Sequence, residues 1–138
     1  PVGFPGGQPE VSVGSCVLGS IFSEGIDLAG QRLIGVLIVG TGIPQICEER
    51  ERIRSYFDRR GKKGYDYAYR FPGMNKVLQA AGRVIRTDRD TGTILLMDDR
   101  FLWRENQMLL PEEWDSYYEV NLDNYENVLE RFWKEQGK

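Results

Sequence analysis

Two short apolar runs, each only long enough for one β-strand, constrain the fold more than any other feature of the sequence. Residues 33–39 are almost continuously apolar and end at Gly40, and residues 93–97 follow a turn that reads Asp-Arg-Asp-Thr-Gly. A strand without polar alternation is typical of a parallel sheet covered on both faces. A third run, residues 11–18, is rich in β-branched side chains and also predicts a strand, which ends at Gly19.

Three stretches space their apolar residues like helices and separate or follow these runs. Residues 46–60 end at Gly61, and Pro72 suits the first turn of a helix that continues through Ala81. The third stretch covers residues 122–136. Strands that alternate with helices predict an α/β fold, built as a mostly parallel sheet with flanking helices.

The chain has 138 residues, which leaves room for one domain. We expect a loop or boundary at residues 1–10, one lobe over residues 11–114, and an acidic C-terminal helix within residues 115–138. That helix would dock on the lobe through a stripe that consists of Leu122, Tyr125, Leu129 and Trp133.

Four aromatic residues alternate with other residues at a period of two, namely Tyr65, Tyr67, Tyr69 and Phe71. This pattern predicts an extended segment with one packed face. The alternative is a platform on which unpaired bases stack, which needs exposed rings.

The chain contains no histidine, and this absence excludes several kinds of active site. Ser–His and Cys–His nucleophile pairs, a histidine general base and histidine-ligated zinc all need that side chain. Two cysteines are too few for a disulfide framework or a four-cysteine iron–sulfur cluster. We therefore expect no metal site. Asp98 and Asp99 are expected to organise a turn or Arg100, with metal binding as the weaker alternative.

No run approaches the roughly 20 apolar residues that a membrane helix needs, so we expect no membrane partner. Residues 1–10 lack the basic and apolar pattern of a signal peptide, which predicts a cytoplasmic protein.

The net charge of −3 is unevenly distributed along the chain. Residues 112–138 carry a balance of −5, whereas residues 50–63 hold a basic cluster. One interpretation of the cluster is a solvated amphipathic helix whose acids pair with its arginines. The other is a nucleic-acid contact, in which the path of the DNA is lined by Arg59, Arg60, Lys62 and Lys63.

Two further segments carry residues suited to phosphate chemistry. Residues 19–28 follow the third predicted strand and read Gly-Ser-Ile-Phe-Ser-Glu-Gly-Ile-Asp-Leu; such loops line ligand crevices in open α/β sheets. Residues 79–86 read Gln-Ala-Ala-Gly-Arg-Val-Ile-Arg. On a helix, Arg83 and Arg86 would project from one face, where guanidinium groups suit phosphate oxygens. Each segment alone has another interpretation. The first also fits a structural turn, and the second also fits the solvated basic end of a helix.

Together and in this order, the two segments resemble motifs V and VI of superfamily 2 helicases, and the wider match resembles the DinG/XPD-like group. There, Phe-Ser-Glu-Gly-Ile-Asp-Leu precedes an apolar strand, a Gly-x-Pro turn (here residues 42–44), an arginine-rich helix, the second segment and a strand ending Asp-Asp-Arg. The resemblance implies the C-terminal RecA-like lobe, of the P-loop NTPase type, of an ATP-dependent DNA helicase. A strand–helix unit that usually opens this lobe is missing here, so we expect an incomplete N-terminal part.

The resemblance implies catalytic roles for three residues of the second segment. Arg86 would be the arginine finger on the γ-phosphate of ATP, with Arg83 beside it. Gln79 would lie near the phosphate or the attacking water. Arginine fingers are worth about 10³–10⁵ in rate in other nucleotide hydrolases.

In the first segment, the resemblance implies that Glu24, Gly25 and Asp27 touch the nucleotide or relay its state to DNA. Ser20 would bond a phosphate of single-stranded DNA. ATP and its Mg²⁺ would be held mainly by the first helicase lobe, which carries the Walker A and Walker B motifs. Neither motif occurs in these 138 residues, so we expect this lobe to be inactive alone. The expected partners are that first lobe and single-stranded DNA, and an uncovered sheet edge would allow self-association.

Two other functions stay open at this point. The chain fits a non-catalytic lobe that binds nucleotide or nucleic acid or is purely structural, and it also fits part of a DinG-like nuclease. Convergence of Arg83, Arg86 and Gly25 on one face would favour the motor.

Overall fold

The computed structural model of the chain describes residues 13–19, 33–87 and 89–137. No helix in these ranges is both long enough and apolar enough to cross a membrane. The elements in chain order are strand β1 (Gly35–Val39), helix α2 (Glu48–Asp58), π-helix η2 (Asp66–Arg70), helix α3 (Phe71–Ala81), strand β2 (Thr93–Met97), 3₁₀-helix η3 (Asp99–Leu102), helix α4 (Arg104–Gln107), 3₁₀-helix η4 (Glu112–Trp114) and helix α5 (Tyr125–Glu135).

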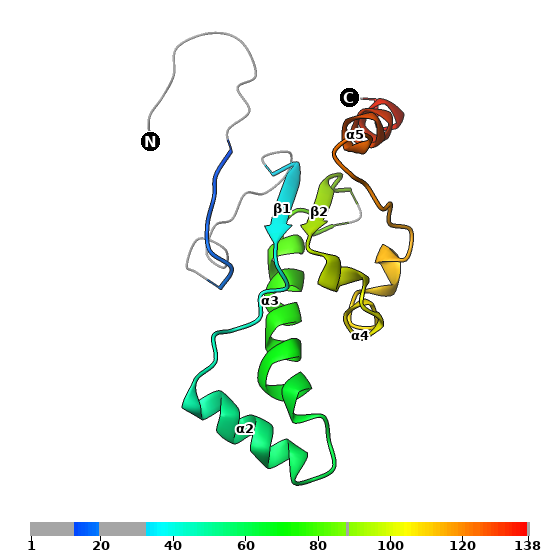
Figure 1. Cartoon of the computed structure of the whole chain (residues 1–138). Coiled ribbons are helices and arrows are strands. Elements are labelled where there is room, and N and C mark those ends of the chain that lie inside the picture. Colours follow the sequence, from blue (N-terminus) through cyan, green and yellow to red (C-terminus); the bar gives the residue numbers. More distant parts are fainter. Residues whose placement is uncertain (1–12, 20–32, 88, 138) are drawn as a thin grey trace, which may run out of the picture.

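β1 and β2 run parallel and side by side, and the chain between them passes through α2 and α3 (Figure 1). The register pairs Gly35 with Thr93 and Val39 with Met97. This arrangement confirms the predicted α/β fold with a parallel sheet. β2 has the predicted bounds, and β1 begins two residues later than the apolar run at residue 33.

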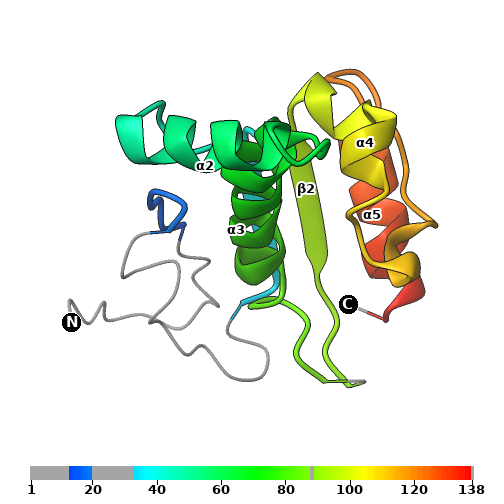
Figure 2. The ribbon, with the colours of Figure 1, turned by 90° about the horizontal axis from the view of Figure 1, so that it is seen from below.

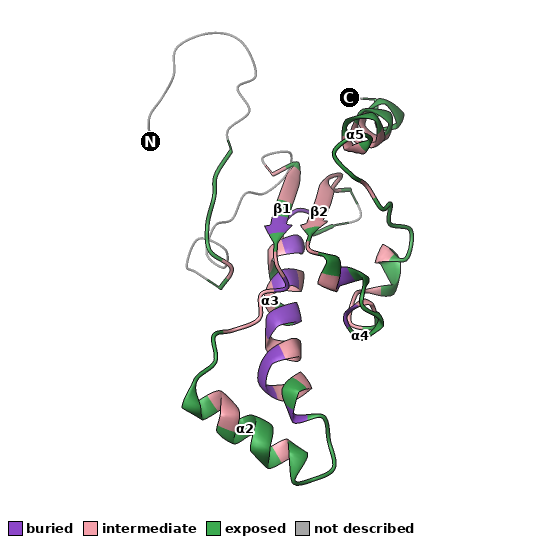
Figure 3. Ribbon diagram, viewed as in Figure 1, coloured by how far each residue is buried: buried purple, intermediate pink, exposed green. Residues whose placement is uncertain are grey.

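α3 covers one face of this sheet and forms the core with it. Met74, Val77 and Ala81 of α3 are buried against Ile38 of β1 and Phe101 of η3. Figure 3 shows the buried residues along α3 in purple. A fully buried apolar side chain contributes roughly 1.5–3 kcal/mol. The strand side chains that face α3 therefore hold the sheet and this helix together.

The other face of the sheet is only partly covered. Leu37 and Val39 are 55% and 71% exposed, and Met97 is 49% exposed. Figures 1 and 2 place α5 on this side of the sheet, next to β2 and opposite α3. Among the described strands, β1 and β2 each keep one edge without a strand neighbour. Self-association through such an edge stays a prediction.

α5 begins later than the sequence predicts. Asn124 is its N-cap residue, and Leu122 precedes the helix and is 89% exposed, so Leu122 takes no part in a docking stripe. Tyr125, Leu129 and Trp133 are half-buried. Docking of the acidic helix through these three side chains stays a prediction.

The predicted strand at residues 11–18 is wrong over its described part. Residues 13–17 have no regular structure, and Leu18 and Gly19 form a turn. A strand needs a neighbour to take up its backbone hydrogen bonds. No described strand lies beside this run, although Leu18 packs against the core.

The segment with alternating aromatic residues is helical, and the prediction of an extended backbone is wrong. It forms η2 and continues directly into α3. Tyr65 stacks on Tyr69 with ring centroids 5.4 Å apart, and Tyr67 meets Phe71 edge-on at 5.2 Å. A period of two also places every second ring four residues away, where side chains on a helix are neighbours.

The loop after β1 lies directly on the first turn of α3. A Cβ on Gly73 would be 2.7 Å from the carbonyl oxygen of Thr41 and 3.0 Å from the nitrogen of Ile43. A Cβ on Gly42, whose φ is +63°, would be 2.7 Å from the carbonyl oxygen of Gly73. Two backbones therefore touch at this point, which only glycine allows.

Candidate nucleotide and nucleic-acid sites

The second predicted segment forms the last turn of α3 and the loop beyond it. Gln79 is exposed in that last turn, and Gly82 is the C-cap residue. The N–H groups of Arg83 and Val84 then bond to carbonyl oxygens three residues back, at 3.2 and 3.0 Å. Arg83 and Arg86 therefore lie beyond the helix, and the prediction that they share a helical face is wrong.

Arg83 and Arg86 nevertheless stay together. Nε of Arg86 donates to the carbonyl oxygen of Arg83 at 3.2 Å. Oδ2 of Asp90 accepts the N–H groups of Arg86 and Thr87 at 3.0 and 2.9 Å. These two backbone donors hold the pKa of Asp90 below its usual range, because they stabilise the carboxylate. The Asp90 side chain thus closes the loop that carries Arg86.

This loop folds back onto the end of the sheet at which both strands begin. Val84 is buried, and a Cβ on Gly92 would be 2.3 Å from Cγ1 of Val84 and 3.0 Å from the carbonyl oxygen of Ile34. The N–H of Thr93 donates to the same Ile34 oxygen at 3.0 Å. Ile34 and Gly92 directly precede β1 and β2. The residue that precedes β1 and the loop that carries the two arginines therefore lie together where the strands begin.

The predicted residues Ser20, Glu24, Gly25 and Asp27 lie outside the described residues. Gly19, at the start of their segment, is described, and a Cβ there would be 3.1 Å from Cε of Lys76. Sequence reasoning missed this half-buried lysine of α3. Lys76 lies three residues before Gln79, and this spacing indicates that the two side chains are on the same side of α3.

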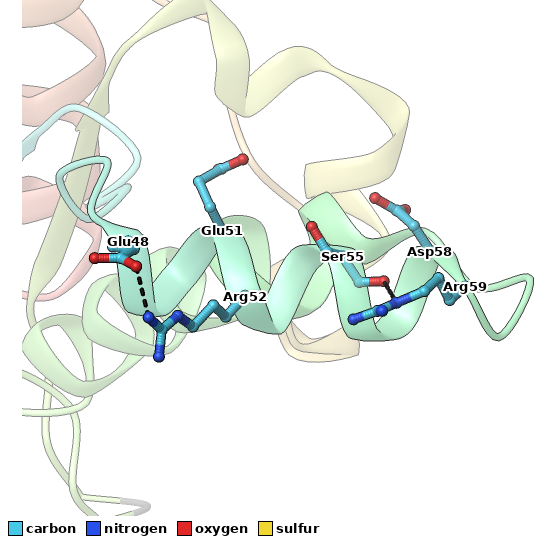
Figure 4. Close-up of a pocket in the computed structure, with 6 residues that line it drawn as sticks. All are labelled: Glu48, Glu51, Arg52, Ser55, Asp58 and Arg59. Atoms are coloured by element: carbon cyan, nitrogen blue, oxygen red, sulfur yellow. Dashed lines mark hydrogen bonds and ion pairs between the residues drawn. The ribbon is translucent and has the colours of Figure 1, made fainter.

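α2 pairs most of its own charges. Arg52 bonds to Glu48 at 2.5 Å (Figure 4). Arg54 lies 3.6 Å from Glu51 and 3.7 Å from Asp58. These pairs are exposed, so each contributes at most about 1 kcal/mol. They confirm, for the helix itself, the interpretation of a solvated amphipathic surface.

The C-cap of α2 and the turn after it differ from the helix itself. Arg59, Arg60, Lys62 and Lys63 are exposed, and none has an ion pair with a carboxylate of the described residues. Nε of Arg59 instead donates to the carbonyl oxygen of Ser55 at 3.2 Å (Figure 4). Ion pairs with described carboxylates therefore do not neutralise these four cations. The nucleic-acid interpretation stays a prediction.

Aromatic residues fix this basic end to the fold. Phe57 of α2 stacks on Tyr67 of η2, with ring centroids 3.9 Å apart and planes 12° apart. Tyr69 is 2% exposed, and its hydroxyl donates to Oε1 of Glu51 at 2.5 Å. That bond to a carboxylate raises the pKa of Tyr69 to about 12. Tyr67 and Tyr69 pack inside the fold, so the alternating segment does not present an open stacking platform.

The end of β2 carries an ion pair that orders the next turn. Oδ1 and Oδ2 of Asp98 accept from Nε and Nη2 of Arg100 at 2.8 and 2.7 Å, and Oδ1 also accepts the Arg100 N–H at 2.9 Å. The guanidinium lowers the pKa of the Asp98 carboxyl. This confirms, for Asp98, the prediction that an aspartate at this position organises a turn or Arg100.

Two hollows on the described surface lie along single helices. One follows α2 between Glu48 and Arg59, and the other follows α5 between Glu126 and Lys134. Both are open to solvent, and neither includes Arg83 or Arg86. Within residues 13–19, 33–87 and 89–137, no group of three acidic or cysteine side chains converges on a metal position. A nucleotide at the Arg86 loop thus needs further groups to enclose it.

Comparison with known proteins gives the family. The model of the helicase C-terminal domain matches residues 7–117. The chain is 30% identical over 125 residues to a regulator of telomere elongation helicase 1 homolog of Caenorhabditis elegans, which covers 83% of the chain and 12% of that protein. It is 31% identical over 116 residues to the regulator of telomere elongation helicase 1 of Mus musculus, covering 78% and 10%. A probable ATP-dependent helicase of Methanocaldococcus jannaschii is 29% identical over 124 residues, covering 80% and 19%.

No solved structure matches the chain. The chain spans between 10% and 19% of the length of these three curated relatives. The matched family agrees with the parallel α/β arrangement. The chain therefore belongs to the helicase C-terminal domain family, as the C-terminal RecA-like lobe of the DinG/XPD-like superfamily 2 helicases.

Proposed function

We propose that this lobe completes the ATP site of a helicase motor by supplying Arg86 and Arg83 to a nucleotide bound by the first lobe. The observation that supports the proposal is the position of the Arg86 loop, which leads into β2 beside Ile34, where both strands begin. Glu24 and Asp27 precede β1 in the sequence and lie outside the described residues, so their place near this loop is part of the proposal.

The donor set at this end of the sheet suits a triphosphate. Guanidinium groups donate in a planar fork that matches phosphate oxygens. We assign the Mg²⁺ ion mainly to the first lobe, as the resemblance to this family implies. Glu24, Gly25 and Asp27 are proposed to contact the nucleotide from the other segment.

ATP supplies the phosphoryl group that is transferred to water, and negative charge spreads over the γ-phosphate oxygens during transfer. Arg86 donates to those oxygens, and Arg83 lies beside it. Gln79, one turn back on α3, orients the attacking water. Asp90 keeps the backbone of Arg86 in one position, so that little reorganisation is needed at the moment of reaction.

The same lobe contacts single-stranded DNA, in this proposal, through Ser20 and through the cations at the end of α2. Closure of the two lobes is favourable while the triphosphate bridges them. Hydrolysis removes that bridge, and the DNA contacts shift when the cleft opens. The lobe alone lacks the Walker motifs and is expected to hydrolyse no ATP.

The test is ATP hydrolysis by the full-length protein, with and without single-stranded DNA. Arg86→Ala is expected to lower kcat by about 10³-fold or more with a smaller change in the KM for ATP. Arg89→Ala, in the same exposed loop, is the matched control and is expected to keep near-normal turnover. Near-normal turnover of Arg86→Ala contradicts the finger assignment, and DNA cleavage by the full-length protein supports the nuclease alternative instead.

A further inference from the structure

We propose that Tyr56 and Arg60, at the end of α2, form a platform on which one unpaired base of single-stranded DNA stacks. This inference rests on the proposed function, because it needs the strand to pass over the basic end of α2. It adds a base contact to a surface for which only phosphate contacts were expected, and it names a tyrosine that the sequence pattern did not single out.

The geometry of the pair supports this role. Cζ of Arg60 lies 3.6 Å from the centroid of the Tyr56 ring, which is van der Waals contact between a guanidinium and a ring. Tyr56 is 47% exposed, and Arg60 is exposed as well. A delocalised, weakly hydrated guanidinium already stacked on tyrosine can take a base on its outer side.

The platform has a firm support beneath it. Tyr56 meets Phe57 edge-on, with ring centroids 5.3 Å apart and planes at 88°. Phe57 in turn stacks on Tyr67 of η2. An exposed ring that is held in place by packed rings loses little conformational freedom when a ligand binds.

The charges around the platform select the ligand. Arg59, Lys62 and Lys63 are exposed cations without an ion pair to any described carboxylate. A polyanion that also carries flat aromatic groups satisfies both features at once. Single-stranded DNA does so independently of its sequence, because every base has a π-face and every nucleotide a phosphate.

A second pair of an arginine and a tyrosine lies in an acidic part of the chain and serves as a comparison. Arg131 of α5 lies over Tyr118, with Cζ 5.5 Å from the ring centroid, and Tyr118 is 67% exposed. It lies within residues 112–138, whose charge balance of −5 repels phosphate. Tyr118 is therefore a matched control: an exposed tyrosine with an arginine beside it, on a surface that should not bind DNA.

The experiment uses the full-length protein and oligo(dT) that carries one 5-iododeoxyuridine, with photo-crosslinks mapped by mass spectrometry. We expect a crosslink within the peptide that carries Tyr56 and Arg60, and none at Tyr118. In equilibrium binding, Tyr56→Ala is expected to weaken affinity by about fivefold or more, whereas Tyr56→Phe keeps it within about twofold. Tyr118→Ala is expected to bind like the unsubstituted protein.

Oligonucleotides with abasic positions separate stacking from charge. Removing the bases should weaken binding to the unsubstituted protein, and the effect should shrink in Tyr56→Ala and in Tyr56→Leu, which keeps an apolar contact to Phe57. If Tyr56→Ala binds normally while Lys62→Gln/Lys63→Gln binds weakly, the stacking proposal is overturned and the phosphate contacts stand. The ATPase of Arg86→Ala reports on the motor proposal separately, because Arg86 is not part of this surface.

Discussion

The carboxylate of Asp90 holds the backbone of Arg86 in place. One oxygen, Oδ2, accepts the N–H groups of Arg86 and Thr87 at 3.0 and 2.9 Å. The position of the proposed finger therefore depends on a charged side chain four residues away. The finger's own side chain adds a bond from its Nε to the carbonyl oxygen of Arg83.

Removing this carboxylate should impair hydrolysis without removing the arginine. Asp90→Ala is expected to lower kcat by about tenfold to a hundredfold. A displacement of the Arg86 guanidinium by about 1 Å is enough to weaken its contact with the γ-phosphate. Asp90→Glu, which keeps the charge, is expected to recover part of the loss. Steady-state kinetics of the full-length protein measure both variants, and normal kcat in Asp90→Ala contradicts the positioning role.

The same carboxylate gives the loop a pH dependence. The pKa of Asp90 is lower in the folded chain than the value of about 3.9 in an unfolded chain. The folded state thus binds fewer protons between these two values, so the stabilisation is present above pH 3.9 and is lost as the pH falls through the lowered pKa. Acid unfolding of the unsubstituted chain should depend on pH more steeply than that of Asp90→Asn.

The cations at the end of α2 predict a salt dependence for DNA binding. Binding of one phosphate by a cation changes the slope of log K against log salt by about 0.7 for single strands, so Lys62→Gln/Lys63→Gln should flatten the slope by roughly 1.4. Arg52→Gln/Arg54→Gln is the control on the same helix, because those arginines already pair with carboxylates. Equal slopes for both double variants contradict the proposed DNA path.

The backbone contact between the β1 loop and α3 predicts a stability effect. Gly73→Ala places a methyl group 2.7 Å from the carbonyl oxygen of Thr41, and relieving this clash is expected to cost about 1–3 kcal/mol of unfolding free energy. Gly14→Ala is the control, since no atom lies within 4 Å of the added carbon, and its change should stay within about 0.5 kcal/mol. Urea unfolding of the chain measures both.

The bond between Tyr69 and Glu51 predicts behaviour at high pH. The pKa of Tyr69 is raised to about 12, whereas an unfolded tyrosine titrates near about 10. The contribution of this bond is therefore complete below pH 10 and is lost as the pH rises to about 12. Phenolate absorbance at 295 nm should show a late phase that Tyr69→Phe removes and Tyr118→Phe retains.

The parts of this fold that could be predicted from sequence are those in which local and long-range signals agree. β2 has apolar residues at four of its five positions and a turn before it, and Pro72 marks the start of α3. The strand-sized runs without alternation correctly indicated a parallel sheet. In each case, the residue types favour the same structure that packing requires.

Other features depend on information that no single segment carries. The end of α3 at Ala81 comes before Arg83, because the loop turns to bury Val84 next to Gly92, a contact across the fold. The aromatic alternation suits both a strand and a helix, and packing on Phe57 favours the helix. The proposed role of Tyr56 was not predicted, since the sequence pattern indicated only a helix position and the role depends on the stacking of Arg60 on its ring.

α3 is held on the sheet both by the packing of Met74, Val77 and Ala81 and by main-chain contact between Gly42 and Gly73. Main-chain atoms cannot rotate out of the way as a side chain does, so this contact resists sliding of the helix. α3 spans about 16 Å, from the end that adjoins η2 to the end that leads into the Arg86 loop. In the proposed motor, this helix and the sheet would therefore move as one body, and translocation would come from the swing of the lobe.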